Sequence, residues 1–567
     1  MFIFCFSDTS TDVPSSSHTA HRNTVRYNTR KHRGAHTSVG TAKRAKGCHL
    51  NATPTPSGTS WLVEKPNTDR TSRSAWLPPF TTQLGYIGQK CMASAAPYEF
   101  LELFLDDKFW QLVTVETNRY MVLKKAESTA QDEELQHLNN VTVSELKKFF
   151  SLYFVMGIVV QPELGDYWQT TSIITQTQAF PQIMSKNRWE AIWSHLHFVD
   201  NAIGIPRGHP GHDRLFKIRE VIRLVTSKFS TYYQAAQKLS LDDMTIDFNG
   251  HSSTEQRGYK AYVLSEAKTG YALQLVLYTG KGNDSVNGAP PESVTSKIVQ
   301  ELVAPHYGLG HIIFTDSCCT SPDIADILHA NKCGMCGMCN ANHSGMPHDI
   351  QPTNMSMRKG DPPLFWRDGH KLACTWRHRR RVTMLSTVDN NTCSVEVHSK
   401  AATSRDRNIL RPTTLSNYFK HIGGVNLLNQ RCQTYLFPHS CRKWYKKLFS
   451  HIVMTAMVNA HIIYTNITAD KRKLTLKDFI CEISQHYAQC GQISIARPQL
   501  IPDSRFTGGH FPYITSSQSN CAYCSTPEKR VRTNIACNIC FVHLCVRRNK
   551  DYEDVHTNCF SLYHTQP

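Results

Sequence analysis

The sequence has little that would hold the chain in a membrane. Its longest apolar run, SLYFVMGIVV at residues 151–160, is well short of the roughly 18 residues that a spanning helix needs. The opening MFIFCF has no basic segment before it and meets the polar, acidic SDTSTD at once, which is not typical of a secretory signal. We therefore expect an intracellular protein with no membrane partner, in which the 20 cysteines are metal ligands or free buried thiols rather than disulfides.

Acidic residues are scarce relative to basic ones. The 567 residues contain 63 Lys and Arg against 45 Asp and Glu, a formal charge of +18. A surplus of this size indicates a polyanionic partner, with nucleic acid first and a membrane surface second. Residues 1–95 hold twelve basic and four acidic residues, are rich in Ser, Thr, His, Asn and Pro, and show no sustained apolar period. They are predicted to be a disordered basic tail.

Helical periodicity dominates residues 96–236. Thr142 and Glu145 have the spacing of a capping box ahead of an apolar stripe that begins at Leu146, which predicts the start of an amphipathic helix. SKNRWEAIWSHLHFV repeats the pattern, and RLFKIREVIRLVTSKFSTYYQAA predicts a third long helix.

The pattern then changes to that of an α/β core. LSLDDMTIDFNG, KAYVLSEA and YALQLVLYTG are strand-like, and the last two are joined by KTG, which fits a hairpin turn. HIIFTDSCCTSPDIADILHAN predicts a buried strand ending at Asp316, a loop, and a helix capped by Ser321. Strands followed by a strand–loop–helix unit indicate an α/β fold.

Two aspartates of this core lie where a catalytic metal site could form. Asp242 falls inside a strand pattern and Asp316 at the end of another. Nucleases and transposases hold two Mg²⁺ ions roughly 3.5 to 4 Å apart on two or three such carboxylates, for phosphodiester transfer. Two aspartates alone fit a strand-edge cap or a salt bridge equally well, so they do not decide the function.

Several motifs, in order and spacing, resemble the piggyBac transposase family and its domesticated derivatives. The motifs are LSLDDMTIDFNGH, KTGYALQLVLYTGK, FTDSCCTS, NHSGMP, MLSTV, RPTTLSNYFKHIGGVNLLNQ and RKWYKKLFSHIVMTAMVNAHIIYTN. The resemblance covers residues 96–565 and implies an α/β fold: a ribonuclease H-like DDE transposase core with an N-terminal helical region, an inserted domain and a C-terminal zinc-binding finger. It also implies a cut-and-paste DNA reaction at TTAA targets, with Asp242 and Asp316 as the first two catalytic aspartates.

The resemblance and the residue patterns together predict seven segments. In chain order they are a disordered basic tail (1–95), a helical N-terminal region (96–236), the first part of the core (237–348), an insertion domain (349–410), the end of the catalytic core (411–480), a linker (481–517) and a cysteine-rich zinc finger (518–567).

The family's third catalytic aspartate is replaced in this chain. The family has a Gly-Gly-Val-Asp motif with a further aspartate three residues on, and Asn426 and Asn429 stand at these places. An asparagine keeps a carbonyl oxygen but lacks the negative charge, so Mg²⁺ binding should be weak or absent. The chain is therefore expected to be catalytically inactive. The alternative that stays open is that Asp243, Asp247 or Asp389 completes the metal site.

Two further departures remove phosphate contacts that the family would make. A lysine-rich strand connection is missing between FNGHSSTEQ and RGYKAYVL, and Asn340, His343 and Ser344 stand where basic residues are expected before GMP. Each change should weaken contacts to a nucleic acid backbone.

The C-terminal segment has the spacing of a zinc-binding domain. Two C-x2-C pairs lie thirteen residues apart at their facing cysteines, and each short loop lets both thiolates reach one tetrahedral ion. We predict two Zn²⁺ ions; the ligands are Cys521, Cys524, Cys537, Cys540, Cys545, Cys559 and His564, with His556 as the eighth and His543 as its alternative. The layout resembles the family's cross-brace finger, in which alternate ligand pairs share an ion and which helps to recognise transposon-end DNA.

Two other groups are more easily explained as structural. CGMCGMCNANH at residues 333–343 has C-x2-C spacing but falls where the family has a core strand, which favours buried thiols over a metal site. Trp444 and Tyr445 lie beside lysines and could stack on a base, although such aromatics more often anchor a helix.

Three functions remain in competition. The first is a transposase-derived protein that binds double-stranded DNA in the nucleus without cleaving it. The second is an active transposase with an unusual metal site, and the third is an interaction module whose finger binds a chromatin protein. Because transposition joins two DNA ends, the resemblance also implies a homodimer.

Overall fold

Among the described residues of the computed structural model, the first element of regular secondary structure is β1 (Leu62–Glu64) and the last is α15 (Cys559–Thr565). The structure describes residues 61–65, 76–82, 84–89, 92–127, 138–171, 174–247, 258–278, 294–389, 392, 394–398, 408–439, 441, 443–468, 473–490, 510–526, 529–538, 540, 542–546 and 558–565.

The predicted α/β core is present as five strands of a nine-stranded sheet. They are β4 (Lys238–Asp247), β5 (Gly258–Glu266), β6 (Ala272–Leu277), β7 (Ile312–Thr315) and β8 (Gly334–Met338). β4, β5 and β6 are antiparallel neighbours, whereas β7 pairs parallel with both β4 and β8. The order β6-β5-β4-β7-β8 makes this the ribonuclease H-like core predicted from the sequence. The central strands are buried on both faces because helices cover both.

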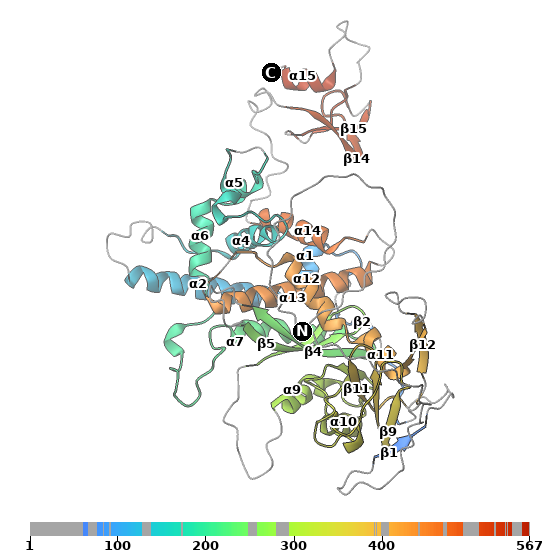
Figure 1. The fold of residues 1–567 in the computed structure, drawn as a ribbon. Helices are drawn as coiled ribbons and strands as arrows, with labels where there is room; N and C mark the ends of the chain where they lie inside the picture. The colour runs from blue at the N-terminus through green and yellow to red at the C-terminus, as the bar shows by residue number, and fades with distance from the viewer. Residues whose placement is uncertain are drawn as a thin grey trace, which may run out of the picture. The chain divides into compact units, whose positions relative to one another are not determined.

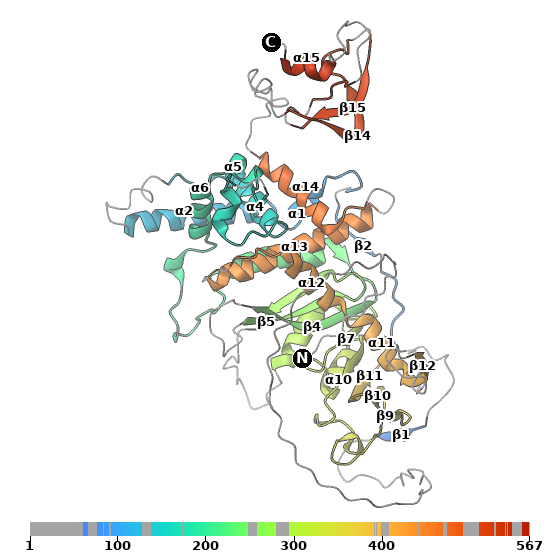
Figure 2. The ribbon, with the colours of Figure 1, turned by 45° about the horizontal axis from the view of Figure 1, so that its top comes forward.

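Helices lie on the two faces of this core (Figures 1 and 2). α12 (Gly424–Tyr435) and α13 (Trp444–Ile467) pack on β4 on one face, while α9 (Val294–Val303) packs against β5 and β6, and α10 (Pro322–Ala330) against β8. α13 is the single helix among the described residues that is long and apolar enough to cross a membrane, and 89% of its apolar window is buried inside the protein. This helix reaches the length and mean hydropathy of a spanning helix although polar residues interrupt its apolar runs, and the core it fills accounts for its composition.

The N-terminal region is helical as predicted, but its third helix is broken. The elements are α1 (Pro97–Glu102), α2 (Asp107–Glu127), α4 (Val143–Met156), η1 (Leu164–Trp168), α5 (Ala179–Ile183), α6 (Lys186–His195), η2 (Asn201–Ile203), α7 (Arg219–Thr226) and α8 (Phe229–Tyr232). The expected single helix is interrupted at Ser227 and Lys228 and gives way to β3 (Tyr233–Gln234), which pairs with β2 (Gly85–Tyr86). Tertiary strand pairing here overrides the helical period.

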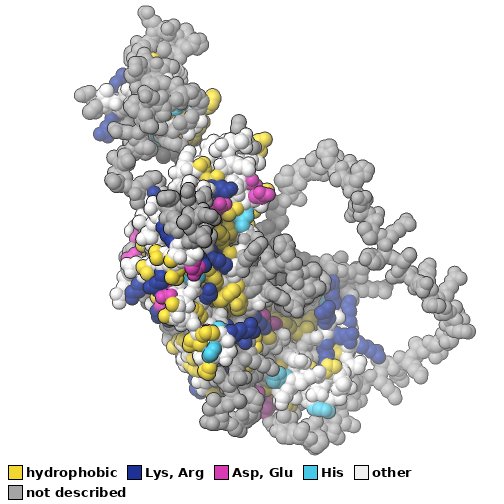
Figure 3. Space-filling view, turned by 90° about the vertical axis from the view of Figure 1, so that its left-hand side faces the viewer, with side chains coloured by type: hydrophobic (Ala, Val, Ile, Leu, Met, Phe, Trp, Pro, Cys, Tyr) yellow, Lys and Arg dark blue, Asp and Glu magenta, His cyan; other side chains and the backbone are white. Residues whose placement is uncertain are grey.

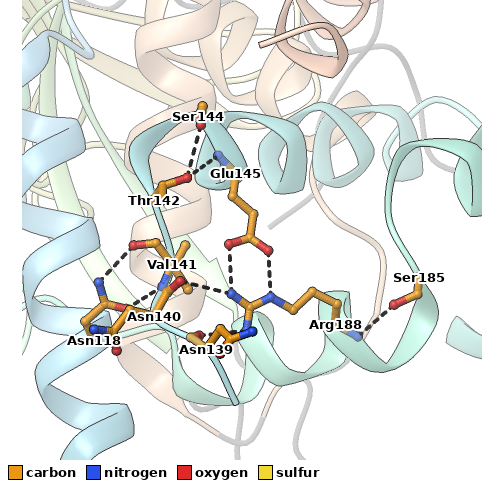
Figure 4. Close-up of polar contacts among 9 residues, drawn as sticks. All are labelled: Asn118, Asn139, Asn140, Val141, Thr142, Ser144, Glu145, Ser185 and Arg188. Atoms are coloured by element: carbon orange, nitrogen blue, oxygen red, sulfur yellow. Dashed lines mark hydrogen bonds and ion pairs between the residues drawn. The ribbon is translucent and has the colours of Figure 1, made fainter. Parts of the chain in front are cut away.

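Only one of the two hydrogen bonds of the predicted capping box is present at the start of α4. The hydroxyl of Thr142 accepts the hydrogen bond from the Glu145 amide (3.2 Å), as an N-cap should. The Glu145 carboxylate instead takes two hydrogen bonds from Arg188 of α6, at 2.6 and 2.8 Å (Figure 4). Arg188 also donates to the backbone oxygens of Asn139 and Asn140, so it joins α6, α4 and the segment before α4.

We expect Arg188→Met to destabilise the helical region by about 2–3 kcal/mol, because half-buried, charge-assisted hydrogen bonds of this kind are lost and the Glu145 carboxylate is left unpaired. The matched control is Arg223→Met, whose partner Glu220 is on the same helix and whose side chain is 64% exposed; loss of such a solvent-exposed pair should change the stability little. Thermal unfolding of the two variants measures the difference, and equal losses would contradict the structural role of Arg188.

The sheet extends beyond the predicted core into the predicted insertion domain. β9 (Leu364–Asp368), β10 (Lys371–Arg377) and β11 (Arg381–Ser386) continue it from β8 in the order β9-β10-β11-β8. β12 (Ser394–His398) and β13 (Asn408–Pro412) form a separate antiparallel pair, followed by α11 (Thr413–His421). The strands of residues 349–410 are thus largely part of the central sheet.

The predicted disordered tail is ordered at β1 and β2. β1 pairs with β9 at the sheet edge, Glu64 forms an ion pair with Arg367, and the Trp61 indole donates to the Gly345 carbonyl. These long-range contacts are not visible in local composition, which explains the error. Residues 1–60 lie outside the described part of the chain.

The chain after α13 contains one more helix of the helical region and the cysteine-rich segment. α14 (Leu476–Ala488) packs on α4 and extends past the predicted end of the core at residue 480, so the linker can begin only after it. The cysteine-rich segment contains β14 (Pro512–Asn520) paired antiparallel with β15 (Arg532–Cys537), and α15.

Candidate functional site

The position of α12 on the sheet is set by a glycine. A Cβ added at Gly424 would lie 2.7 Å from the Ser265 hydroxyl and 2.8 Å from the Glu266 carbonyl, too close for any other residue. The Ser240 hydroxyl also donates to the Ile422 carbonyl (2.5 Å). Only a glycine therefore allows the start of α12 to approach β4 and β5 this closely.

This close packing brings Asn426 to Asp242. Asp242 lies in the middle of β4, and the Asn426 Nδ2 donates to its Oδ2 at 3.5 Å. The face of α12 that would carry a metal-binding carboxylate thus presents an amide N–H to the carboxylate of the strand. The N–H group is a hydrogen-bond donor, and the asparagine lacks the negative charge that a carboxylate would bring to a metal ion at this position.

Asp316 lies close to Asp242 on the adjacent strand end. β4 and β7 are parallel, with Leu241 opposite Thr315. Asp242 and Asp316 are the residues that follow these two, so they lie side by side. Burial, and secondly the charge of Asp316, raise the pKa of Asp242 to about 7. Burial and a neighbouring negative charge both disfavour the ionised form of a carboxyl group.

A second group of side chains meets at Asp316. Ligand atoms of Asp243, Asp316 and Cys318 all lie within 4.8 Å of one another. The Cys318 thiol donates to Asp243 Oδ1 at 3.1 Å, and Lys260 of β5 lies 3.2 Å from Asp243 Oδ2. Asp243 was one of three substitutes considered in the sequence, whereas Cys318 and Lys260 were missed; the adjacent aspartates in LSLDDM and the TDSCC loop were the only signals.

The remaining candidates do not join these groups through the described contacts. Asn429 lies one turn further along α12, and its side-chain Oδ1 accepts a hydrogen bond from the Gln433 side chain. Asp389 bonds to Ser386 and Asn417, and burial raises the pKa of its carboxyl. The side chain of Asp247 is outside the described residues.

The cysteines of the C-terminal segment form two groups. The first contains Cys521, Cys524, Cys545 and Cys559, with ligand atoms within 4.8 Å of one another. The Cys545 amide donates to the Cys521 sulfur (3.4 Å). Burial alone would raise the pKa of the Cys521 thiol, but backbone hydrogen bonds of this kind outweigh it and the pKa is lowered. Four sulfur donors at this spacing could hold one tetrahedral metal ion.

The second group contains a histidine that sequence reasoning missed. Cys537 and Cys540 lie with His564 and His510, and the His510 Nδ1 is 3.3 and 3.2 Å from the two sulfurs. The His564 Nδ1 bonds the Phe560 carbonyl (2.7 Å), and its Nε2 lies 3.4 Å from the Cys540 sulfur. Such a backbone bond fixes the tautomer in which Nε2 carries the lone pair that a metal ligand needs.

Among the described residues, His510 is the fourth member of the second group, and the alternative His543 is not part of it. His543 bonds the Thr515 hydroxyl (3.1 Å), and His556 lies outside the described residues. Along the chain the pairs Cys521/Cys524, Cys537/Cys540 and Cys545/Cys559 alternate between the two groups, as in the cross-brace of the resembled family, and the second group is completed by one histidine at each end, His510 and His564. A lone histidine eleven residues before the first cysteine gives no spacing signal.

The cysteines of residues 333–343 and the aromatic pair Trp444 and Tyr445, which were interpreted from the sequence as structural, contact other parts of the folded chain. Cys333, Cys336 and Cys339 are buried, and their thiols contact three different backbone carbonyls, of His306, Thr414 and Thr320. Tyr445 is 4% exposed and packs at the start of α13, with its hydroxyl 3.3 Å from His197, while the ring of Trp444 lies 5.4 Å from that of Tyr259. Tyr445 therefore anchors the helix.

Comparison with known proteins identifies the family of this chain. The family model described as Transposase IS4 matches residues 96–461, which include Asp242, Asp316 and both asparagines. PiggyBac transposable element-derived protein 3 of Homo sapiens is 24% identical over 497 residues, covering 83% of this chain and 76% of that protein. The chain belongs to the piggyBac transposase family.

Two further comparisons agree with this membership. PiggyBac transposable element-derived protein 2 of Homo sapiens is 23% identical over 454 residues, covering 76% of this chain and 72% of that protein. The piggyBac transposase in a synaptic complex with hairpin DNA, solved by cryo-EM, has a TM-score of 0.60 at 19% identity and covers 81% of this chain and 97% of that one. The piggyBac fold predicted from the motifs is thereby confirmed.

Proposed function

We propose that this member of the piggyBac family is a transposase-derived protein that binds double-stranded DNA in the nucleus and does not cleave it. The observation that carries the proposal is the hydrogen bond from the Asn426 amide to Asp242. It stands where the family's third carboxylate would share a metal ion with that aspartate. With an N–H donor in this place, Mg²⁺ loses a ligand and a compensating charge.

Two observations support DNA as the partner. The chain carries a formal charge of +18, and Lys and Arg side chains form several groups on the face drawn in Figure 3. The structurally similar piggyBac transposase was solved in a complex with hairpin DNA. A basic surface binds duplex DNA by displacing the counterions of its phosphates.

The C-terminal finger is proposed to hold two zinc ions and to contribute to this binding. Four thiolates in one group, and two thiolates with two imidazoles in the other, are the donor sets that structural zinc prefers. Lys529, Arg530 and Arg532 lie between the two C-x2-C pairs, where they can reach phosphates.

The full-length chain should bind duplex DNA with an affinity that falls steeply with salt. If the protein neutralises about six phosphates, log K should fall with log salt with a slope of roughly −5. Fluorescence anisotropy with a labelled duplex, measured over a salt series, gives this slope. A flat salt dependence, or no binding, would instead favour a protein partner such as a chromatin component.

The charge of the finger provides a matched test of where DNA is bound. Replacing Arg530 and Arg532 with Gln should reduce the magnitude of the salt slope by about two, since each phosphate contact contributes roughly one. The control is Lys371→Gln in the sheet, whose side chain is only 12% exposed and pairs with Asp326. An unchanged slope in the finger variant would place DNA elsewhere on the chain.

A further inference from the structure

The donors at the transposase metal position do not suit the Mg²⁺ pair of the family. Magnesium takes oxygen ligands in nearly octahedral geometry. In this chain Asn426 donates an N–H to Asp242, while Asp316 lies in a separate group with the Asp243 carboxylate and the Cys318 sulfur. A thiolate is a soft ligand that selects zinc and similar ions over magnesium.

We infer that Asp243, Asp316 and Cys318 form a binding site for one thiophilic divalent ion, with zinc as the natural occupant. Zinc–sulfur bonds of about 2.3 Å and zinc–oxygen bonds of about 2.0–2.2 Å put the ligand atoms of one tetrahedral ion roughly 3.5 Å apart. The Cys318 sulfur is already 3.1 Å from Asp243 Oδ1, and all three ligand atoms lie within 4.8 Å. Small side-chain rotations suffice to close the site.

The charges of the cluster also match one divalent ion. On binding, the Cys318 S–H bond breaks, the sulfur takes the metal, and the proton leaves to solvent. Two carboxylates and a thiolate then carry three negative charges, and Lys260 beside Asp243 supplies one positive charge. One divalent ion makes the group neutral, whereas two would leave it strongly positive.

The proposed site is open to solvent on the side of Cys318. Asp243 and Asp316 are half-buried, while Cys318 is exposed at the end of β7. Three protein ligands with an open fourth position are the arrangement in which zinc keeps a bound water. The site is distinct from the finger, so this inference extends the proposed function without depending on DNA binding.

The test is the metal content of the reduced full-length chain after dialysis against buffer with zinc, measured by mass spectrometry and without DNA. The parent should hold about three zinc ions per chain, two in the finger and one in this site, and Cys318→Ser should hold one fewer. The matched control is Cys481→Ser on α14, a half-buried thiol, which should hold as many as the parent. Excess Mg²⁺ in the dialysis buffer should not lower the count.

A second measurement uses cadmium as the probe. The Cys318→Ser chain should lose part of the sulfur-to-cadmium absorbance of the parent, and Asp243→Asn should weaken cadmium binding while leaving every thiol in place. Equal zinc counts and equal cadmium absorbance in the parent and Cys318→Ser would overturn the inference, as would loss of the zinc ion to Mg²⁺. Because no DNA is present, either result leaves the DNA-binding proposal to its own test.

Discussion

Chelating zinc from the full-length protein is expected to unfold the C-terminal finger while the ribonuclease H-like core stays folded. The buried centre of the finger consists mainly of the cysteines of the two groups, with Leu544 and Phe560 as its principal apolar members. Structural zinc contributes about 10–16 kcal/mol of folding free energy per ion in small domains, and so few apolar side chains cannot replace it. The loss should be complete rather than partial.

Hydrogen exchange of the intact chain measures this effect. Amides of β14 and β15 should be protected in the presence of zinc and should exchange freely in chelator, whereas those of β4 and β7 should keep their protection. A finger that remains protected in chelator would show that zinc does not hold it together.

The assignment of the last ligand can be tested by a pair of histidine variants. His510→Ala should lose one zinc ion relative to the parent, because His510 lies against both sulfurs of Cys537 and Cys540. His543→Ala is the matched control in the same finger; its ring bonds Thr515, so the zinc count should not change. If His556→Ala loses the ion and His510→Ala keeps it, the ligand predicted from the sequence is the right one.

Sequence patterns reveal candidate metal ligands only when these lie close together in the sequence. The C-x2-C pairs were found because both ligands lie in one short loop, and the N-cap at Ser321 was found because its partner is three residues away. His510 is joined to its cysteines only by the pairing of β14 with β15. A ligand whose neighbours are set by tertiary structure leaves no local spacing to detect.

The same limit applies to the candidate active site. Asp242 and Asp316 were identified because each lies in a strand pattern, and the family motif added Asn426. The position of Cys318 beside Asp243 was missed because a loop residue gains its neighbours only when β4 and β7 are aligned. The extension of the sheet by β9–β11 was missed for the same reason, since a strand pattern does not name its partner.

Restoring the family's carboxylates with Asn426→Asp and Asn429→Asp should give the chain Mg²⁺-dependent nicking of a TTAA-flanked DNA end that the parent lacks. The change replaces the amide beside Asp242 with a metal ligand and adds two negative charges on α12. Bound Mg²⁺ activates the attacking oxygen and stabilises the leaving oxygen, which together lower the barrier by several kcal/mol, and each 1.36 kcal/mol is tenfold in rate. An increase of more than about a hundredfold is therefore expected, measured with an end-labelled duplex.

The restored chain should also respond to Mg²⁺ without DNA. In the double variant a third carboxylate faces Asp242 and Asp316, so the site is destabilised by repulsion until a cation binds. Its melting temperature should rise with Mg²⁺ concentration, because a ligand that binds only the folded state stabilises it. The parent should show no such rise.

Two controls separate this effect from a general change in charge. Gln430→Glu adds a negative charge to the same helix on an exposed position and should produce neither nicking nor a response to Mg²⁺. Adding Asp242→Asn to the double variant should abolish both, since Asp242 is the carboxylate that Asn426 contacts. If the parent nicks DNA as fast as the double variant, a carboxylate such as Asp243 already completes the site, and the assignment of this chain as a non-cleaving transposase derivative is wrong.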